Sequence, residues 1–394
     1  MVIRPDDMRP EDFPVQPRLL GEYPEVEPLL ALCTKGKLYE IEWWIDAGKP
    51  IQYPPPTDRK LQRKDTGLQI AVAKGFHSLA ALLLANGYDP NADYYECLST
   101  PARTRDHDMV ELLLRFGADP HACDFCDVLE TCDRALMDRL VAAGVDPARK
   151  NALARALQTK RRPILGFVKQ YQQQFPGIQR QIDIALHYFT DSSDARGVAL
   201  MLWLGANPHT PTSSNLEEWA ETEHDPNSTA FHSALYSSKP EIMDMIAKRP
   251  IPLDRVDAIF HLVGYRPRPA LVRRLLDMGA DPNSVGPEGE HVLHDFVHPI
   301  LSRFRRNTEE DALAFQSLEL VLKAGAKWTV SERRLKCLRR DLIDGESASV
   351  VRLLALLNQY HALTPQQFYE LTRTDAVKRV LNGQSKPRRS FWDP

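Results

Sequence analysis

The segment HACDFCDVLETC carries four side chains that could bind a metal ion. Its sulfur and nitrogen donors are His121, Cys123, Cys126 and Cys132. A Cys-x-x-Cys pair with two further donors of this kind can hold a tetrahedral Zn²⁺ ion. A structural zinc site is therefore one interpretation of this segment.

A second candidate contains three histidines, His291, His294 and His298. The stretch HDFVH is similar to the motif H-E-x-x-H, in which two histidines one helical turn apart bind zinc beside a glutamate base. Asp295, which is one methylene shorter, stands in the place of the glutamate. A metal-dependent hydrolase that uses His294 and His298 is thus an alternative function.

The sequence shows no glycine loop for phosphate, no G-x-S-x-G elbow and no paired carboxylates that stand apart from its general pattern. Basic side chains do gather in several places, and a nucleic-acid-binding protein that uses them is a further alternative. Acidic residues are interspersed among them, which is typical of solvated helix faces. The basic clusters comprise Lys160, Arg161, Arg162, Arg266, Arg268, Arg273, Arg274, Arg303, Arg305, Arg306, Arg339 and Arg340.

The composition is that of an ordinary soluble protein. The 394 residues are 43% apolar and 26% charged, with a net charge of −3, which gives no general attraction to nucleic acid or anionic membranes. No apolar run reaches the roughly 18 residues that would span a bilayer. The acidic, Pro-rich beginning does not resemble a secretory signal, and six cysteines in so long a chain do not indicate a disulfide framework. We therefore expect a cytoplasmic protein.

A pattern of two short helices followed by glycine recurs along the chain. From Thr66 the sequence TGLQIAVAKGFHSLAALLLANGYDPN gives an apolar helix, a Lys-Gly break, a second helix, Gly87 and a Pro-containing turn. Glycine after a helix adopts the left-handed cap, and a following proline prevents continuation. Similar endings stand at Gly117, Gly144, Gly205 and Gly279, with weaker ones at Gly48 and Gly325.

This pattern resembles the ankyrin repeat family, whose units run roughly T-P-L-H-x-A-A to L-L-L-x-x-G-A-D-P. With each final glycine at position 22, ten unit starts follow at an average spacing of about 34 residues. Position 18, which was not used to set this frame, is apolar in every unit. The starts are Glu27, Thr66, Glu96, Cys123, Asn151, Ile184, Thr229, Ala258, His291 and Cys337.

The repeat frame gives the candidate metal ligands other roles. Cys123 and Cys126 fall at positions 1 and 4 and Cys132 at position 10, which places them at opposite ends of a first helix, about 9 Å apart. His294 falls at position 4, together with His187, His232 and His261. The family resemblance implies that this histidine binds the backbone of neighbouring turns. We therefore expect no metal, no cofactor and no enzymatic activity.

The fold class expected from the resemblance is all-α, an ankyrin-repeat solenoid of about ten helix-turn-helix units with short finger loops. Residues 1–26 form an acidic, Pro-rich segment, 27–358 the solenoid, 359–382 a helical C-terminal cap and 383–394 a basic tail. Lengthened connections are expected at 51–64, 172–181 and 210–227, and an insertion within the ninth unit at 302–311.

Aromatic side chains in these connections have no core to fill, and Tyr, Trp and Arg dominate protein–protein hot spots. The resemblance implies a non-catalytic protein-binding scaffold or inhibitor, a monomer on its own, which engages a specific protein through its concave finger and first-helix surface. Neither nucleic acid nor membrane is an expected partner. The residues predicted to bind the partner are Tyr53, Tyr94, Tyr95, Trp219, Arg303, Arg305 and Arg306.

Overall fold

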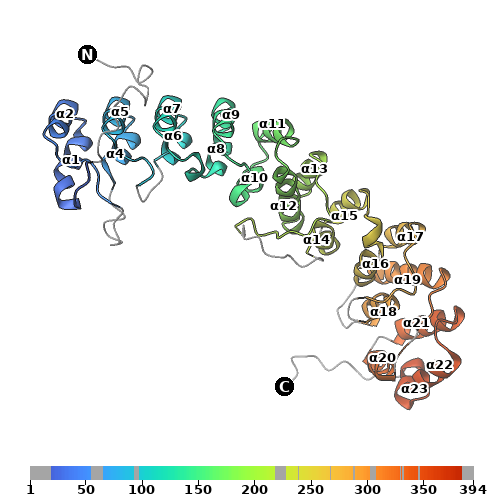
Figure 1. Ribbon diagram of the computed structural model, residues 1–394. Coiled ribbons are helices and arrows are strands. Elements are labelled where there is room, and N and C mark those ends of the chain that lie inside the picture. Colours follow the sequence, from blue (N-terminus) through green and yellow to red (C-terminus); the bar gives the residue numbers. More distant parts are fainter. Residues whose placement is uncertain are drawn as a thin grey trace. The chain divides into compact units, whose positions relative to one another are not determined.

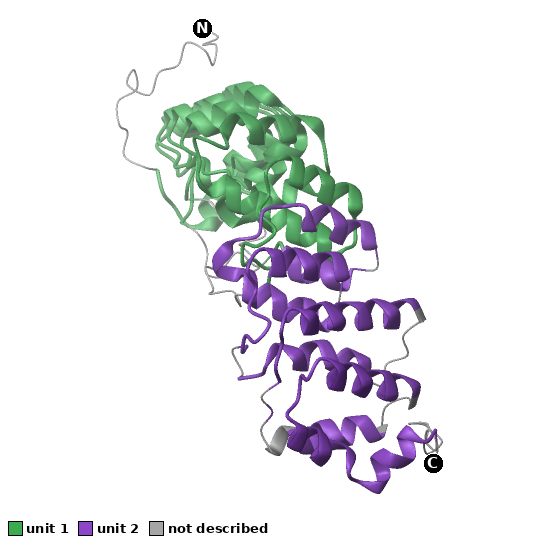
Figure 2. Ribbon diagram, turned by 90° about the vertical axis from the view of Figure 1, so that its right-hand side faces the viewer, with its two compact units in different colours: residues 1–228 green, residues 229–394 purple. Residues whose placement is uncertain are grey.

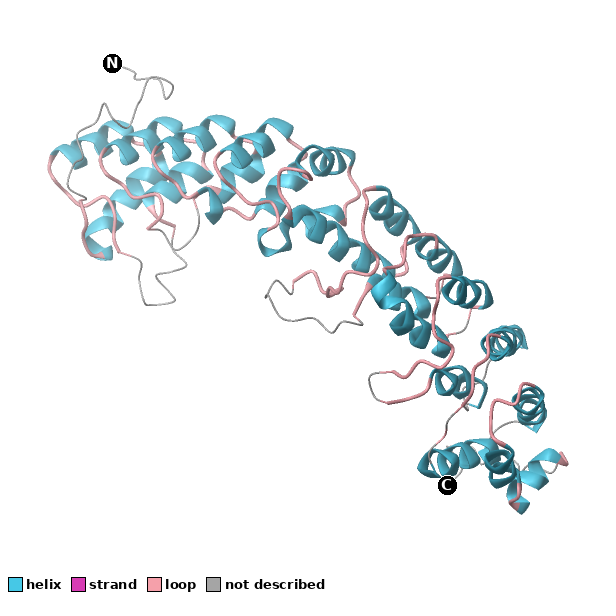
Figure 3. Ribbon diagram, turned by 45° about the vertical axis from the view of Figure 1, so that its right-hand side comes forward, coloured by secondary structure: helices cyan, strands magenta, loops and turns pink. Residues whose placement is uncertain are grey.

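The computed structural model describes residues 19–54, 65–92, 97–217, 228–237, 239–266, 268–286, 289–301, 308–328, 330, 332–344 and 347–383. Its internal contacts divide the chain into two compact units, residues 1–228 and 229–394, where the sequence suggests one continuous run of repeats (Figure 2). The described residues form helices and loops, with isolated bridges between Leu20 and Gln52 and between Val285 and His291 (Figure 3). None of the described helices is long and apolar enough to cross a bilayer.

Unit 1 is a row of six antiparallel helix pairs. The first helices lie side by side in one layer and the second helices in another, so that each pair covers the apolar faces of its neighbours (Figure 1). The pairs are α1 (Tyr23–Lys35) with α2 (Leu38–Asp46), α4 (Gly67–Ala73) with α5 (His77–Ala85), α6 (Ser99–Thr104) with α7 (His107–Arg115), α8 (Phe125–Thr131) with α9 (Arg134–Ala142), α10 (Ala152–Leu157) with α11 (Arg162–Tyr171), and α12 (Gly177–Asp191) with α13 (Ala195–Trp203).

Unit 2 continues the same pattern with four pairs and then a short fifth. The fifth pair, α22 (Pro365–Thr372) with α23 (Asp375–Leu381), lies where the sequence predicts a helical cap. The other pairs are α14 (Ala230–Tyr236) with α15 (Pro240–Ala247), α16 (Val256–Tyr265) with α17 (Pro269–Asp277), α18 (Val292–Leu301) with α19 (Thr308–Lys323), and α20 (Glu332–Asp344) with α21 (Ser347–Gln359). The prediction of about ten helix-turn-helix units and a helical cap is confirmed.

The helix ends follow from local sequence. In unit 1 the side chains of Asp106, Asp133 and Asp194 accept hydrogen bonds from backbone N–H groups in the first turns of α7, α9 and α13. All seven glycines that the sequence marks as caps have a positive φ, between 68° and 102°, which a side chain would disfavour. They are Gly48, Gly87, Gly117, Gly144, Gly205, Gly279 and Gly325.

The same three aspartates also tie neighbouring repeats together. Asp106 pairs with the ring of His77 at 2.8 Å and Asp133 with that of His107 at 2.7 Å, while Asp194 pairs with Lys160. Burial alone would raise the pKa of Asp133, but the N–H of Leu136 and the ring of His107 outweigh it and hold the pKa below its usual value. Each capping carboxylate thus stabilises its own helix and the contact with the preceding pair.

The core lies between the two helix layers. Nine of the ten side chains at position 18 are at most 3% exposed, and only Trp44, in the first pair, is half-buried. One expected connection differs from its prediction. Of residues 172–181, those from Gly177 onward belong to α12, which is 15 residues long and begins well before the predicted unit start at Ile184.

Candidate functional site

Tyr53 does not offer the exposed surface that its prediction assumed. Its side chain is 6% exposed, and its ring packs edge-on against that of Tyr23 in α1, with the centroids 5.3 Å apart. In this position it anchors the chain to the first repeat, which corrects its assignment as a partner-binding residue. The other six predicted residues lie outside the described part of the chain: Tyr94, Tyr95, Trp219, Arg303, Arg305 and Arg306.

The connection that carries Trp219 follows α13 and is held closed at its base. The N–H of Thr212 donates to the carbonyl of Ser228 at 2.9 Å, and the Ser228 hydroxyl donates to the carbonyl of Thr212, also at 2.9 Å. The hydroxyl of Thr212 bonds Nδ1 of His187, a buried position-4 histidine of α12, at 3.0 Å. These bonds hold the two ends of the connection together. We call residues 207–228 the finger loop.

A buried carboxylate fixes the start of the finger loop to the same helix. Asp183 of α12 accepts hydrogen bonds from the N–H of Asn207 and the hydroxyl of Thr210, both at 2.7 Å, and from Gln179 at 2.9 Å. Its side chain is almost fully buried, and this burial raises its pKa despite the three donors. These bonds compensate much of the cost of burying a polar group.

A third anchor joins the finger loop to α10. The carboxamide of Asn151 donates to the carbonyl of Leu216 at 3.3 Å and accepts from Gln181 of α12 at 3.1 Å. The oxygen of Gln181 in turn accepts from the N–H of Ala154 at 3.1 Å. Asn151 and Gln181 are both buried. The described residues of the finger loop are thus fixed at several points to α12 and to Asn151 at the start of α10.

The cysteine segment is placed as the repeat frame predicts. Cys126 lies in α8, and Cys132 adopts a left-handed conformation (φ 59°) in the turn between α8 and α9. Cys126 is buried, and this burial raises the pKa of its thiol to about 12. The described residues contain no group of three or more potential metal ligands.

We expect the purified chain to contain no stoichiometric zinc, iron or copper, because the candidate ligands occupy structural positions of the repeat. Elemental analysis of the untreated protein checks this expectation. A stoichiometric metal ion that disappears in Cys126→Ser or His294→Ala would contradict it.

His294 and His298 lie one turn apart on α18, with ring centroids separated by 6.0 Å. The resemblance implied that the His294 ring binds the backbone of neighbouring turns. Instead, the partner of its Nδ1 is the carboxylate of the adjacent Asp295, at 3.4 Å. Asp295 itself is buried, with 3% of its side chain exposed, and so is not placed as a solvent-accessible base.

Asp295 belongs to a network that the sequence did not reveal. Nδ1 of His261, on α16, lies 2.5 Å from Asp295 Oδ2, and Nε2 of the same ring lies 3.2 Å from the hydroxyl of Ser284. Burial alone would raise the pKa of Asp295, but bonds from His261, His294 and Tyr265 outweigh it and lower the pKa. The order hydroxyl, imidazole, carboxylate is that of serine hydrolases. In unit 1 the ring of His187 also lies 3.0 Å from a hydroxyl, that of Thr212, although through Nδ1, so an imidazole–hydroxyl contact occurs in both units.

Several members of the basic clusters are engaged within the chain. Lys160 pairs with Asp194, and Arg161 donates to the carbonyl of Glu130. In unit 2 Arg274 donates to the carbonyl of Arg249 at 2.9 Å, and Arg339 to that of Glu370 at 2.6 Å. These side chains stabilise contacts between repeats, which accounts for their presence without nucleic acid.

Two aromatic side chains on α2 are the most exposed large hydrophobic residues of the described chain. Tyr39 is 85% exposed and Trp43 is 81% exposed. Two other exposed aromatic residues have cationic neighbours: Lys169 lies 3.4 Å from the ring centroid of Trp203, and Arg266 lies 5.2 Å from that of Tyr236. Tyr39 and Trp43 were not among the predicted partner-binding residues, because they lie in a helix and not in a connection between units.

No protein-family model matches the chain, and no curated protein sequence matches it. Among solved structures it is similar to the ankyrin repeat domain of human ASB11, at 18% identity and a TM-score of 0.29, over 75% of this chain and 97% of that one. It is also similar to the ankyrin repeat domain of Bcl-3, a member of the IkappaB protein family, at 16% identity and a TM-score of 0.31, over 73% of this chain and 96% of that one. The ankyrin-type repeat fold assigned here rests on the chain's own helix pairs, glycine caps and buried position 18.

Proposed function

We propose that this chain is a non-catalytic scaffold or inhibitor that binds a specific protein through the finger and first-helix side of its repeats. The observation that supports this proposal is the anchoring of the finger loop by buried polar side chains. Repeat units present extended surfaces, and residues added between units gather on the side that binds partners.

The energetic argument concerns the cost of ordering a loop. Holding flexible side chains and loops in place opposes binding, unless the free protein has already ordered them. Here Asp183, Gln181 and His187 are buried and turned toward the finger loop or its anchors. A connection whose described residues are anchored in this way is suited to binding with little further loss of entropy, and Trp219 belongs to this connection.

The test compares two tryptophans of unit 1. Trp219→Ala removes the predicted contact of the finger loop, and Trp203→Ala is the matched control, because Trp203 is 56% exposed on α13 and lies outside the loop. Proteins captured from native lysate by the parent chain are purified, and their affinities for the three chains are measured by calorimetry. We expect Trp219→Ala to lose about 2 kcal/mol or more of binding free energy, with an unchanged melting temperature, and Trp203→Ala to bind like the parent.

Equal affinities of all three chains would contradict the proposal. So would a fall in the melting temperature of Trp219→Ala in proportion to its lost affinity, because Trp219 would then be a structural anchor of the loop.

A further inference from the structure

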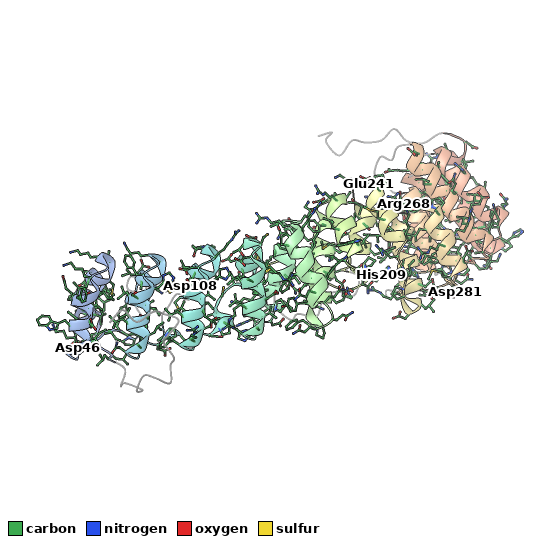
Figure 4. The ribbon with its side chains drawn as sticks, turned by 90° about the horizontal axis from the view of Figure 1, so that it is seen from above. Asp46, Asp108, His209, Glu241, Arg268 and Asp281 are labelled. Carbon is green, nitrogen blue, oxygen red and sulfur yellow. The ribbon has the colours of Figure 1, made fainter. Side chains whose placement is uncertain are left out.

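One face of α2 combines exposed aromatic rings with carboxylates. Tyr39, Glu42, Trp43 and Asp46 are spaced i, i+3, i+4 and i+7, so they lie together on the same side of the helix. All four side chains are exposed, and Figure 4 labels Asp46 at its place in the first repeat. We call these four residues the α2 face.

The later repeats show what contacts the side chain at the position that Trp43 occupies in the first repeat. Trp43 stands at position 17 of its unit, and the equivalent Leu112 and Phe167 are buried. The guanidinium of Arg134, from the preceding helix pair, lies 5.6 Å from the ring centroid of Phe167. At the same position Arg139 pairs with Glu111 and Arg274 donates to the carbonyl of Arg249, so position 17 faces the preceding pair in several later units. The α1/α2 pair is the first described one, and 81% of the Trp43 side chain is left uncovered.

Local structure does not require this exposure, as the neighbouring Trp44 shows. Trp44 Nε1 donates to the carbonyl of Pro50 at 3.0 Å, and Lys49 Nζ lies 4.5 Å from its ring centroid. Trp44 thus stabilises its own repeat, whereas Trp43 is exposed to solvent.

The charge around the rings defines what could cover them. Glu40 pairs with Lys37, whereas Glu42 and Asp46 form no ion pair or hydrogen bond with the described residues. Two carboxylates on one face repel phosphate, and hence nucleic acid and anionic membranes. Arginine and lysine side chains, by contrast, can bind these carboxylates and stack on the face of Trp or Tyr.

We propose that the α2 face binds a basic, arginine- or lysine-bearing segment of a protein partner. Cationic groups of the segment lie over Trp43 and Tyr39 and donate hydrogen bonds to Glu42 and Asp46. This surface is separate from the finger loop, so the scaffold has a second binding site that functions without the first.

The test uses a fluorescent synthetic peptide that alternates arginine and leucine, titrated with the full chain and followed by anisotropy. We expect Trp43→Ala and Tyr39→Ala each to weaken binding about tenfold or more, a typical result for exposed rings that become buried on binding. The double variant Glu42→Gln/Asp46→Asn should weaken binding at low salt and reduce its dependence on salt. The thermal unfolding of all three variants should match that of the parent, since these side chains are exposed.

A charge-matched control separates this site from general attraction. Glu241 and Asp244 are exposed on α15 at the spacing i, i+3, and Figure 4 labels Glu241. Glu241→Gln/Asp244→Asn makes the same charge change and should leave peptide binding unaltered. Trp219→Ala should also leave it unaltered, so failure here is distinguishable from failure of the finger-loop proposal.

Four outcomes would overturn the inference. The variants of the α2 face could bind the peptide as the parent does. Alternatively, Glu241→Gln/Asp244→Asn could weaken peptide binding as much as Glu42→Gln/Asp46→Asn, which would indicate attraction by net charge alone. A peptide that alternates glutamate and leucine could bind as tightly, which would rule out charge complementarity. Finally, the parent could bind no peptide and instead form a dimer that Trp43→Ala dissociates, which would make a second copy the occupant.

Discussion

Replacing Asp295 by alanine should lower the free energy of unfolding by about 3–5 kcal/mol, because more than one hydrogen-bond donor loses its acceptor at a cost of about 1–3 kcal/mol each. The carboxylate is buried, lies 2.5 Å from the ring of His261 and is also bonded by His294 and Tyr265. Without it, the ring of His261 keeps a buried donor that has lost its acceptor. Urea denaturation measures the loss, and hydrogen exchange should show it in α16 and α18, which pack directly on each other.

Asp295→Asn is the matched control, because it keeps the volume and one acceptor oxygen but removes the charge. It should cost about 1–3 kcal/mol, the range for one weakened buried hydrogen bond. If Asp295→Ala costs no more than Asp295→Asn, the volume and the oxygen that asparagine keeps contribute little, and the loss comes from removing the charge.

The same network should make unit 2 sensitive to acid. The pKa of Asp295 is lowered in the folded state, so its contribution to stability is present above the unfolded value of about 4 and is lost as the pH falls through the folded pKa. Burial, together with the nearby His261, lowers the pKa of His291 below 6.5. His291 therefore takes up a proton less readily in the folded state than in the unfolded chain. The free energy of unfolding begins to fall as the pH drops below about 6.5.

Two variants separate the two acid steps. Asp295→Asn should remove the step at lower pH. His291→Asn should remove the step at higher pH while keeping an oxygen that can accept from the N–H of Leu293, as the ring now does at 3.2 Å. Unfolding free energies that do not change between neutral pH and pH values well below 6.5 would contradict the assignment.

The repeat fold could be predicted because its causes are local. A glycine that ends a helix, an aspartate that begins the next and an apolar side chain at position 18 are each read from a few neighbouring residues. The structure accordingly gives a positive φ at all seven glycine caps and burial at nine of ten position-18 side chains. The start of α12 was misplaced, because residues 177–183 lengthen this helix before the repeat frame begins.

The sites were harder to predict because they depend on residues far apart in the chain. The buried ring of Tyr53 packs against Tyr23, which lies 30 residues earlier in α1, so a residue of a connection anchors the chain to the first repeat. Asp295 faces His261 from the next repeat, 34 residues away, and a linear pattern cannot show that the two side chains meet. Trp43 differs again. The equivalent side chains Leu112 and Phe167 are buried in later units, whereas Trp43, in the first described pair, is 81% exposed.

Phe167→Ala should have an effect on unit 1 comparable to that of Asp295→Ala on unit 2. The ring of Phe167 is fully buried and joins two successive repeats: its centroid lies 5.7 Å from that of Phe125 in α8 and 4.7 Å from that of Tyr171 in α11. Removing it deletes apolar contacts and leaves a cavity between two rigid helix pairs, which should cost about 3–5 kcal/mol.

Tyr171→Phe gives a control at the same contact. It keeps the ring that packs on Phe167 and removes only the hydroxyl, which donates to Asp138 at 2.8 Å, so the expected loss is about 1 kcal/mol. Because each repeat contacts only its neighbours, the destabilisation by Phe167→Ala should be greatest in the two pairs that share the ring. Hydrogen exchange should therefore accelerate most from α8 to α11, and less in α1 and α2. If Phe167→Ala lowers the free energy of unfolding no more than Tyr171→Phe does, the helices must shift to fill the cavity. The contact between these repeats would then be less rigid than the burial of Phe167 indicates.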